Sequence, residues 1–385
     1  MPRQPLQTVR SVVVKLGTQL LSKPDRTLDT DFIARIAAQI ATLREQGIRV
    51  TVVSSGAVGA GMAALKLVKR PADLATLQAV AAVGQPRLLA AWSDALAPHG
   101  LAAAQILLTR EDIDHRTRFL NLRNTLAAAE TLGAVPVINE NDTVSTDEMV
   151  RISFGDNDLL AALVTQSIQA QLLVLLSVVD GVLDAAGKSV RTVATPDEAQ
   201  ALVRKEKSAA GKGGMDSKVN AARIVTATGE HLVVADGRTP DVLPRLLAGE
   251  ELGTVFLPSS RPGKTTAARG KNRWISSARP TGSVTVDDGA AKALARGDRS
   301  LLPAGITDVK GKFEPGDLIE ILTTTGTTLA RGLTNYSASQ ILLIRGKKSQ
   351  EVRKLLPDAS YDEVIHRDHL LLLPPDRASN VAASR

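Results

Sequence analysis

Residues 135–164 read VPVINENDTVSTDEMVRISFGDNDLLAALV, and this stretch decides the fold class. The run VPVIN at 135–139 predicts a buried strand, and DLLAALV at 158–164 predicts a buried helix. Strands that alternate with helices form a parallel sheet whose two faces are both covered. Ligands of such sheets bind beyond the carboxyl ends of the strands, which is where the polar residues of this stretch fall.

Two polar clusters, INEND and GDND, lie at the two ends of the loop between the strand and the helix. Six acidic side chains fall within residues 139–158 and repel one another unless cations join them. The carboxylates and amides are those of Asn139, Glu140, Asn141, Asp142, Asp147, Glu148, Asp156, Asn157 and Asp158. Their density predicts a functional site, and a solvated acidic loop is the alternative that this stretch alone leaves open.

The alternation of strands and helices extends over the first 256 residues. Apolar or β-branched runs predict further strands at SVVVKLG, RVTVVSS, LAAAQILLT, LLVLLSVV and HLVVAD. Amphipathic stretches such as 31–46 and 116–132 predict helices between them. We therefore predict an α/β fold, a three-layer αβα sandwich with a mainly parallel sheet, over residues 1–256.

A different pattern begins at Gly282, where short strands follow one another closely. The runs SVTVD, LIEIL, TLARGL and ILLIR predict strands, separated by the turns EPGD and TTTG. We predict a small, mostly β domain at 277–373. Residues 257–276 are rich in Pro, Gly, Ser and basic side chains and predict a linker, and 374–385 predicts a disordered tail.

The composition restricts the kind of protein. Hydrophobic residues make up 44% of the 385 residues but aromatic residues only 2%, so the core is aliphatic and few rings are present to stack bases. The lack of cysteine excludes disulfides and thiolate chemistry and is compatible with the cytoplasmic location that we predict. The N-terminal apolar run is short and is interrupted by Lys15, so we predict neither a signal peptide nor a membrane segment.

The formal net charge of +7 favours an anionic partner, either a small substrate or nucleic acid. Residues 261–279 carry six Lys or Arg and no acid, whereas residues 280–385 carry 14 basic and 13 acidic side chains. The C-terminal domain is therefore close to neutral, which argues against strong RNA binding there.

Two glycine-containing turns follow predicted strands and suit phosphate or carboxylate groups. Lys15 and Gly17 end the first strand, where an ammonium group and unhindered backbone N–H groups would be available. The turn SSGAVGAG, which includes Ser55, precedes an Ala-rich helix whose N-terminus carries free N–H groups. A solvated lysine and a well-capped helix remain the simpler interpretations of each turn by itself.

A third glycine run, GKGGMDSK at 211–218, begins another predicted helix. Glycines beside a lysine in a first helical turn would close over a polyphosphate, although a mobile solvated loop fits the pattern equally well. Gly263-Lys264-Thr265 resembles the end of a P-loop, but that motif requires glycine where this chain has Pro258, so we reject it.

The five histidines show no metal-ligand spacing and no arrangement with Ser and Asp, so the sequence assigns no metal ligand and no general base. Phosphoryl transfer to a carboxylate needs no base, because the acceptor, with a pKa of roughly 4, is already ionised. Such a site needs only cations to neutralise the phosphoryl group and a geometry that holds the attack in line.

Taken together and in this order, VVVKLGTQ, VVSSGAVGAG, VINEND, GDND and GGMDSK resemble the glutamate 5-kinases of the amino acid kinase family. The later runs GSVTVDDGA, SLLPAGI, GKFEPGDLIEI and ARGLTNYS resemble the PUA domain that follows many bacterial members. The resemblance implies ATP- and Mg²⁺-dependent conversion of L-glutamate to L-glutamyl 5-phosphate, the first step of proline biosynthesis. It also implies feedback inhibition by L-proline and a homo-oligomer.

The resemblance also implies roles for particular residues. Lys15 and Lys218 match the phosphate-contacting lysines, and Asp158 matches the aspartate that organises them. The positions that match glutamate-binding residues are Ser55, Asp142 and Asn157. The positions that match ATP-binding residues are Lys15, Ser177, Val178, Lys212, Gly213, Gly214, Met215 and Lys218.

The chain departs from the family pattern at two nucleotide positions. Val178 stands where an aspartate is usual, and Lys212 stands where a threonine precedes GGM. Two other classes remain open: an amino acid kinase that acts on acetylglutamate or aspartate, and an RNA-binding PUA protein.

Overall fold

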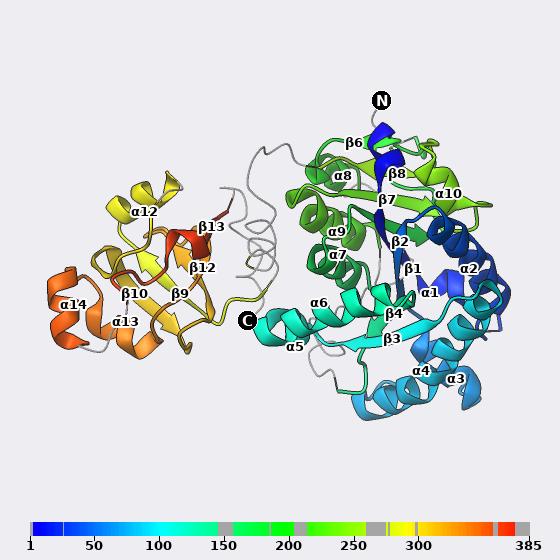
Figure 1. Cartoon of the computed structure of the whole chain (residues 1–385), viewed down its shortest axis with the longest axis horizontal. Coiled ribbons are helices and arrows are strands. Elements are labelled where there is room, and N and C mark those ends of the chain that lie inside the picture. The colour runs from blue at the N-terminus through cyan, green and yellow to red at the C-terminus, as the bar shows by residue number, and fades with distance from the viewer. Residues whose placement is uncertain are drawn as a thin grey trace. The chain divides into compact units, whose positions relative to one another are not determined.

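The computed structural model describes residues 3–25, 27–144, 157–184, 186–203, 214–258, 275, 278–296, 299–356 and 361–373. The chain divides into two compact units, Met1–Pro262 and Gly263–Arg385 (Figure 1). Most of the predicted linker at 257–276 and the whole predicted tail at 374–385 lie outside the described residues, so the predicted boundaries stay predictions. Across the described part of the chain, no helix is both long and apolar enough to cross a membrane.

The first unit contains an eight-stranded sheet in the order β3-β4-β2-β1-β5-β7-β8-β6. The strands are β1 (Ser11–Leu16), β2 (Arg49–Ser54), β3 (Ala103–Leu108), β4 (Val135–Glu140), β5 (Leu172–Ser177), β6 (Thr192–Val193), β7 (His231–Asp236) and β8 (Thr254–Phe256). Every neighbouring pair is parallel except β7 and β8, which are antiparallel. The predicted mainly parallel sheet is confirmed.

Helices cover both faces of this sheet. Those of the first unit are α1 (Thr18–Leu21), α2 (Thr30–Glu45), α3 (Ala57–Ala64), α4 (Leu74–Leu96), α5 (Arg110–Asp114), α6 (Arg116–Thr131), α7 (Asn157–Ile168), α8 (Pro196–Val203), α9 (Met215–Ala227) and α10 (Val242–Leu247). Helices α2 and α10 lie on one side of the strands, and α6, α7 and α9 lie on the other (Figure 1). The three-layer αβα sandwich is therefore confirmed.

The first strand shows why its lysine reaches the α7 side. All six residues of β1 are buried, as a central strand between two helical layers requires. Val12, Val14 and Leu16 belong to one core cluster with side chains of α2 and α4, including Trp92. Successive side chains of a strand point to opposite faces, so Lys15 points to the layer that contains α7 and α9.

The central strand β1 lies between β2 and β5. The chain reaches these two neighbours of β1 through helices on opposite faces of the sheet. After β1 it passes through α2 to β2, and before β5 it passes through α7, which packs on the other face. A crevice at such a switch point is where doubly wound sheets bind ligands. Gly17, Ser55, Asn141 and Val178 each follow the carboxyl end of a strand at this edge.

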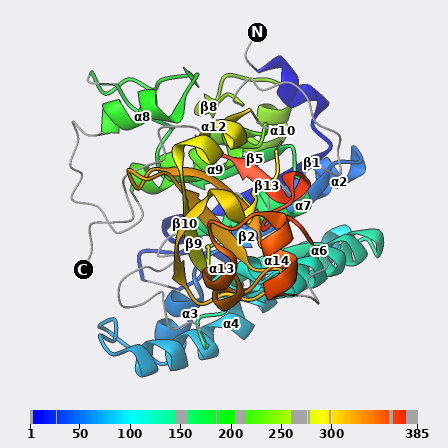
Figure 2. The same cartoon turned by 90° about the vertical axis from the view of Figure 1, so that its left-hand side faces the viewer.

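Helices α3 and α4 pack unusually closely, and two glycines allow it (Figure 1 and Figure 2). A Cβ atom on Gly61 would lie 1.9 Å from the Val80 carbonyl oxygen, and one on Gly84 would lie 1.8 Å from the Ala57 carbonyl oxygen. Gly56, before α3, has a φ of 105°, which favours glycine. These glycines hold the SSGA turn against α4.

The second unit is built on a five-stranded sheet in the order β10-β9-β11-β12-β13. Its elements are β9 (Gly282–Val286), α12 (Asp288–Ala295), β10 (Ile306–Gly311), β11 (Leu318–Leu322), β12 (Thr328–Leu333), α13 (Ala338–Ile344), α14 (Ser349–Leu355) and β13 (Leu370–Leu372). Its core cluster includes Val284, Ile319, Ile321 and Tyr336. The prediction that this part of the chain forms a small, mostly β domain is confirmed.

One predicted strand of this unit is wrong. The run ILLIR predicts a strand, but most of it belongs to helix α13. Ser337 caps that helix, and its capping box with Gln340 begins the helix ahead of the apolar run. Ile341 and Ile344, three residues apart, are buried, and the two leucines between them are about half exposed, as a helix requires.

Candidate active site

A buried carboxylate joins two lysines at the centre of the first unit. Asp158 Oδ1 lies 2.5 Å from Lys15 Nζ, and Asp158 Oδ2 lies 3.0 Å from Lys218 Nζ. The Asp158 side chain is fully buried, and the two lysine side chains are 5% and 7% exposed. The structure thus brings together the three residues predicted to be catalytic, although Asp158 follows Lys15 by 143 positions and Lys218 follows Asp158 by 60.

Each of these side chains is placed by a different element. Lys15 is the fifth residue of β1, Asp158 lies in the first turn of α7, and Lys218 lies in the first turn of α9. Helices α7 and α9 pack against one another, and α7 also packs on β1. A lysine from the strand and one from the neighbouring helix therefore reach the same carboxylate between the two layers.

The electrostatics keep this cluster charged. Burial by itself would raise the pKa of Asp158, but the two lysine ammonium groups more than offset it and hold the pKa of Asp158 below its usual value. Among the contacts that the structure describes, two ammonium groups face one carboxylate, an excess of one positive charge. Such a charge suits an entering anion, and phosphoryl transfer requires this kind of stabilisation.

A network of amides lies in the same unit, and it is organised by Asn157, the residue before Asp158. The Asn157 Nδ2 group donates to the Ser54 carbonyl oxygen at 2.8 Å, to Ser55 Oγ at 2.9 Å and to Asn139 Oδ1 at 3.0 Å. Its two hydrogens serve three acceptors, which hold the amide in place. The network ties the carboxyl ends of β2 and β4 to the start of α7.

Asp142 lies at the far end of this network. Gln85 Nε2, from α4, donates to the Glu140 carbonyl oxygen at 3.0 Å and to Asp142 Oδ2 at 3.3 Å. Burial raises the pKa of Asp142 to about 6, while the bond from Gln85 and the charge of Arg70 act in the opposite direction. Asp142 is therefore an anion at neutral pH that gains from meeting a cation.

The turn that carries Ser55 is braced from behind. Trp92 of α4 is fully buried, and its Nε1 donates to Ser54 Oγ at 3.0 Å. Ser54 Oγ in turn donates to the Ser55 carbonyl oxygen at 3.2 Å. The structure thus brings the predicted substrate residues Ser55 and Asn157 into direct contact and links them to the strand end that leads to Asp142.

The residues predicted to contact nucleotide lie at two places along the same edge. Ser177 ends β5, its carbonyl oxygen accepts from Gly237 N at 2.9 Å, and Val178 packs against the apolar core. Gly214 precedes α9 and Met215 begins it, three residues before Lys218. Lys212 and Gly213 lie outside the described residues. Roles in nucleotide binding stay predictions for all of these positions.

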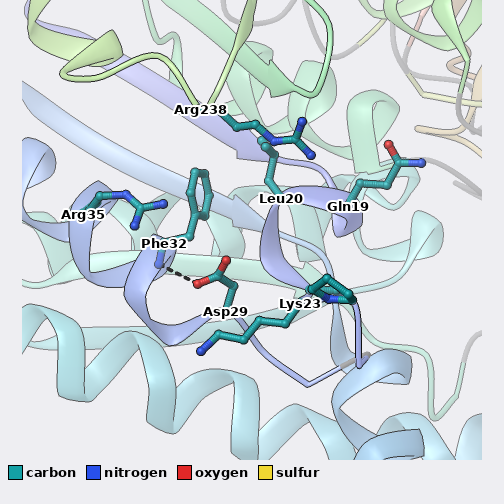
Figure 3. A pocket seen from close by; sticks show the side chains of 9 residues that line it. Gln19, Leu20, Lys23, Asp29, Phe32, Arg35 and Arg238 are labelled. Carbon is teal, nitrogen blue, oxygen red and sulfur yellow. Dashed lines mark hydrogen bonds between the residues drawn. The ribbon is translucent and has the colours of Figure 1, made fainter.

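A pocket of about 650 Å³ opens beside α1 and the start of α2 (Figure 3). Its lining includes Gln19, Phe32, Arg35 and Arg238, and Asp29 within it accepts a hydrogen bond from Phe32 N at 2.9 Å. None of the predicted site residues that the structure describes lines this pocket. It combines cations with a carboxylate and an aromatic ring, and we assign it no role.

Two amides of the network, those of Gln85 and Asn139, receive no role from the sequence alone. Asn139 falls within the polar cluster INEND, whereas Gln85 lies in an apolar helical stretch, AAVGQPRLL, that carries no motif. The available signal in the sequence was a polar side chain between Gly84 and Pro86 within an apolar helical stretch. The fixed orientation of both amides is visible only once α4 and β4 are placed side by side.

Comparisons with known proteins agree with this architecture. A model of the amino acid kinase family matches residues 10–236, more than half of the chain, and a model of the PUA domain matches residues 282–356. The protein therefore belongs to the amino acid kinase family, with a PUA domain after the kinase-family domain.

Its curated relatives include glutamate 5-kinases that match it along nearly its whole length. The glutamate 5-kinase of Trichlorobacter lovleyi is 44% identical over 383 residues, which cover 97% of this chain and 99% of that protein. The glutamate 5-kinase of Thermus thermophilus is 42% identical over 375 residues, covering 96% and 99%. Among solved structures, Giardia carbamate kinase covers 65% of this chain and 99% of its own at 16% identity, with a TM-score of 0.48.

Proposed function

We propose that this protein transfers the γ-phosphoryl group of ATP to the side-chain carboxylate of L-glutamate and forms L-glutamyl 5-phosphate, the first step of proline biosynthesis. The observation that carries the proposal is the pairing of Lys15 and Lys218 on the buried Asp158. The identity to glutamate 5-kinases, 42–44% across the chain, supports the choice of substrate.

The lysine cluster would stabilise the transferring group. In the transition state, the phosphoryl group carries negative charge on its equatorial oxygens. Positioned ammonium groups lower the barrier by neutralising that charge. Asp158 holds Lys15 and Lys218 at a fixed separation and does not itself take a proton. The attacking carboxylate is ionised at neutral pH, so no general base is needed.

The amide network would bind the amino acid. The carboxylate of Asp142 suits the substrate ammonium group, while Ser55 and Asn157 suit its carboxylates. Because Asn157 is adjacent in sequence to Asp158, binding of glutamate and organisation of the lysines would depend on the same first turn of α7. This arrangement would place the acceptor oxygen and the phosphoryl-stabilising cations at one end of one helix.

The nucleotide would bind along Ser177, Val178 and residues 212–218, with Lys15 and Lys218 on its phosphates. Mg²⁺ would accompany it and neutralise phosphate charge. In the part of the chain that the structure describes, no group of three or more His, Cys, Asp or Glu side chains could hold a metal ion. In kinases, Mg²⁺ usually keeps several waters and is bound through substrate phosphates together with one or two carboxylates.

We propose three further properties from the family resemblance: feedback inhibition by L-proline, a homo-oligomeric state and a cytoplasmic location. A separate candidate function is RNA binding by the PUA domain of the second unit. The near balance of 14 basic and 13 acidic side chains in residues 280–385 disfavours strong binding, which depends on neutralising phosphates.

The proposal is tested by ADP release with ATP and Mg²⁺ in the presence of L-glutamate, N-acetyl-L-glutamate or L-aspartate, each with and without L-proline. Turnover that depends on L-glutamate is expected. Turnover only with one of the other two acceptors would agree with the fold but contradict L-glutamate as the substrate. Retention of RNA on the full chain without any kinase activity would favour the binding class instead.

A further inference from the structure

Gln85 is a buried polar side chain in the middle of a long helix. It lies in α4 between Gly84, which allows close contact with α3, and Pro86. The residue is 5% exposed. A buried amide costs free energy unless its donors and its acceptor are all satisfied, so its partners define what this position does.

The partners of Gln85 are all groups at the end of β4. Its Nε2 donates to the Glu140 carbonyl oxygen at 3.0 Å and to Asp142 Oδ2 at 3.3 Å, and its Oε1 accepts from Asn139 Nδ2 at 3.3 Å. Both Nε2 contacts are to oxygens that can only accept, so the orientation of the amide is fixed. Both hydrogens of the amide are used.

The fixed orientation is passed along the network. Because Asn139 Nδ2 faces Gln85, Asn139 Oδ1 faces the other way and accepts from Asn157 Nδ2 at 3.0 Å. Asn157 then reaches Ser55 Oγ at 2.9 Å. One buried glutamine therefore connects the Asp142 carboxylate to the Asn157 amide through Asn139.

On this geometry we propose that Gln85 is a positioning residue for the amino acid substrate. It orients the Asp142 carboxylate towards the substrate ammonium group and fixes the Asn139 and Asn157 amides in the direction that the substrate carboxylates require. This inference rests on the proposed glutamate kinase function. Gln85 touches no reacting atom and acts only through residues that bind the substrate.

The charge of Asp142 gives the inference a distinctive signature. Burial raises the pKa of Asp142 to about 6, and Gln85 from α4 and Arg70 from the segment between α3 and α4 lower it. Removing the Gln85 donor raises that pKa further. Because only the ionised carboxylate attracts the substrate ammonium group, the acid limb of kcat/KM for glutamate moves to higher pH when the donor is lost.

The test compares ADP release by the full chain over pH 5 to 8 for the wild type and for Gln85→Leu, Gln85→Glu and Gln39→Leu. Gln39 is the matched control: it is 7% exposed, lies in α2 and accepts from the Leu243 backbone N–H at 3.0 Å. Gln39→Leu loses a buried glutamine of comparable burial away from the amide network. It lowers Tm while leaving KM for glutamate within about twofold.

Gln85→Leu is expected to raise KM for glutamate by roughly 10-fold to 100-fold, the range for losing a hydrogen bond to a charged group. KM for ATP stays within about twofold, and the acid limb moves up. If Gln85→Leu does not fold, Gln85→Glu keeps the side-chain volume and places a second acid beside Asp142, which must also move the acid limb up.

Unchanged KM for glutamate and an unmoved acid limb in the variant that folds would overturn the positioning role. That result would leave the proposed function intact, because the wild type would still phosphorylate glutamate. A wild type without glutamate-dependent turnover would instead overturn the proposed function, and this inference with it.

Discussion

Lys15 Nζ lies 2.5 Å from Asp158 Oδ1, although strand β1 and helix α7 are separated by most of the first unit in sequence. Lys218 occupies the other oxygen of the same carboxylate at 3.0 Å. The carboxylate thus sets the distance between two cations that would otherwise repel one another. On the proposed function, catalysis and the stability of the fold would depend on the same buried group.

Asp158→Asn is predicted to lower kcat by about 100-fold or more while KM for glutamate changes little, because the lysines lose their fixed positions. The same change removes the carboxylate that the two buried ammonium groups share and costs about 3 kcal/mol of stability. Steady-state kinetics and urea unfolding measure the two effects. Asp31→Asn, at an exposed position in the first turn of α2, serves as the control for a lost carboxylate and should reproduce neither effect.

The stability effect of Asp158→Asn has a defined pH dependence. The pKa of Asp158 is held below its usual value of 3.8, so the carboxylate contributes its full stability above that pH. The contribution falls as the pH drops through the lowered value. The difference in unfolding free energy between wild type and variant should therefore be constant from pH 5 to 8 and shrink below pH 4. A difference that declines already between pH 7 and 5 would contradict the lowered pKa.

The pKa of Asp142 is shifted in the opposite direction to that of Asp158, and the shift predicts a pH dependence of the kinetics. Its pKa is raised to about 6, so it becomes protonated, and loses its attraction for an ammonium group, as the pH falls through 6. The kcat/KM for glutamate should fall about 10-fold per pH unit below that point. Asp142→Asn should raise KM for glutamate at pH 7.5 and abolish this acid limb. A persisting limb in the variant would assign the titration to another group.

The close packing of α3 on α4 predicts contrasting effects for two glycines of the same helix. A Cβ on Gly61 would meet the Val80 carbonyl oxygen at 1.9 Å, whereas the nearest described atom to a Cβ on Gly59 is Ser22 Oγ, at 3.8 Å. Gly61→Ala should cost about 2–3 kcal/mol and raise KM for glutamate, because α3 and α4 carry the Ser55 turn and Gln85. Gly59→Ala should be neutral or stabilising by up to about 1 kcal/mol. Equal unfolding free energies for the two variants would refute the packing argument.

Val178 predicts an altered nucleotide site. It stands where the family pattern has an aspartate, and it packs against the apolar core beside Ser177. Val178→Asp should change KM for ATP or the preference between ATP and GTP several-fold and leave KM for glutamate unchanged. Nucleotide constants equal to those of the wild type would count against any role of this position.

Much of the fold was predictable from local sequence. The β-branched or apolar runs SVVVKLG and LLVLLSVV predict strands buried on both faces, and the amphipathic stretches between such runs predict the covering helices. The strand predicted for ILLIR is wrong because a short apolar run has no clear period. Its helical state is decided by the cap at Ser337, outside the run.

The site was less accessible to sequence reasoning. Lys15, Asp158 and Lys218 are far apart in the chain, and only the family resemblance linked them before the structure showed their contacts. Gln85 belongs to no sequence motif. Its hydrogen bonds form only because α4 packs beside the end of β4. Contacts between distant segments are set by the packing of whole layers, which no local pattern encodes.

The most direct test of the central claim is to identify the product. The protein is incubated with ATP, Mg²⁺, L-glutamate and hydroxylamine, which traps an acyl phosphate as its hydroxamate. We predict the 5-hydroxamate of glutamate in an amount equal to the ADP formed, and none when glutamate is omitted. ADP release without any hydroxamate, or hydroxamate formation only from another amino acid, would contradict phosphorylation of the glutamate side chain.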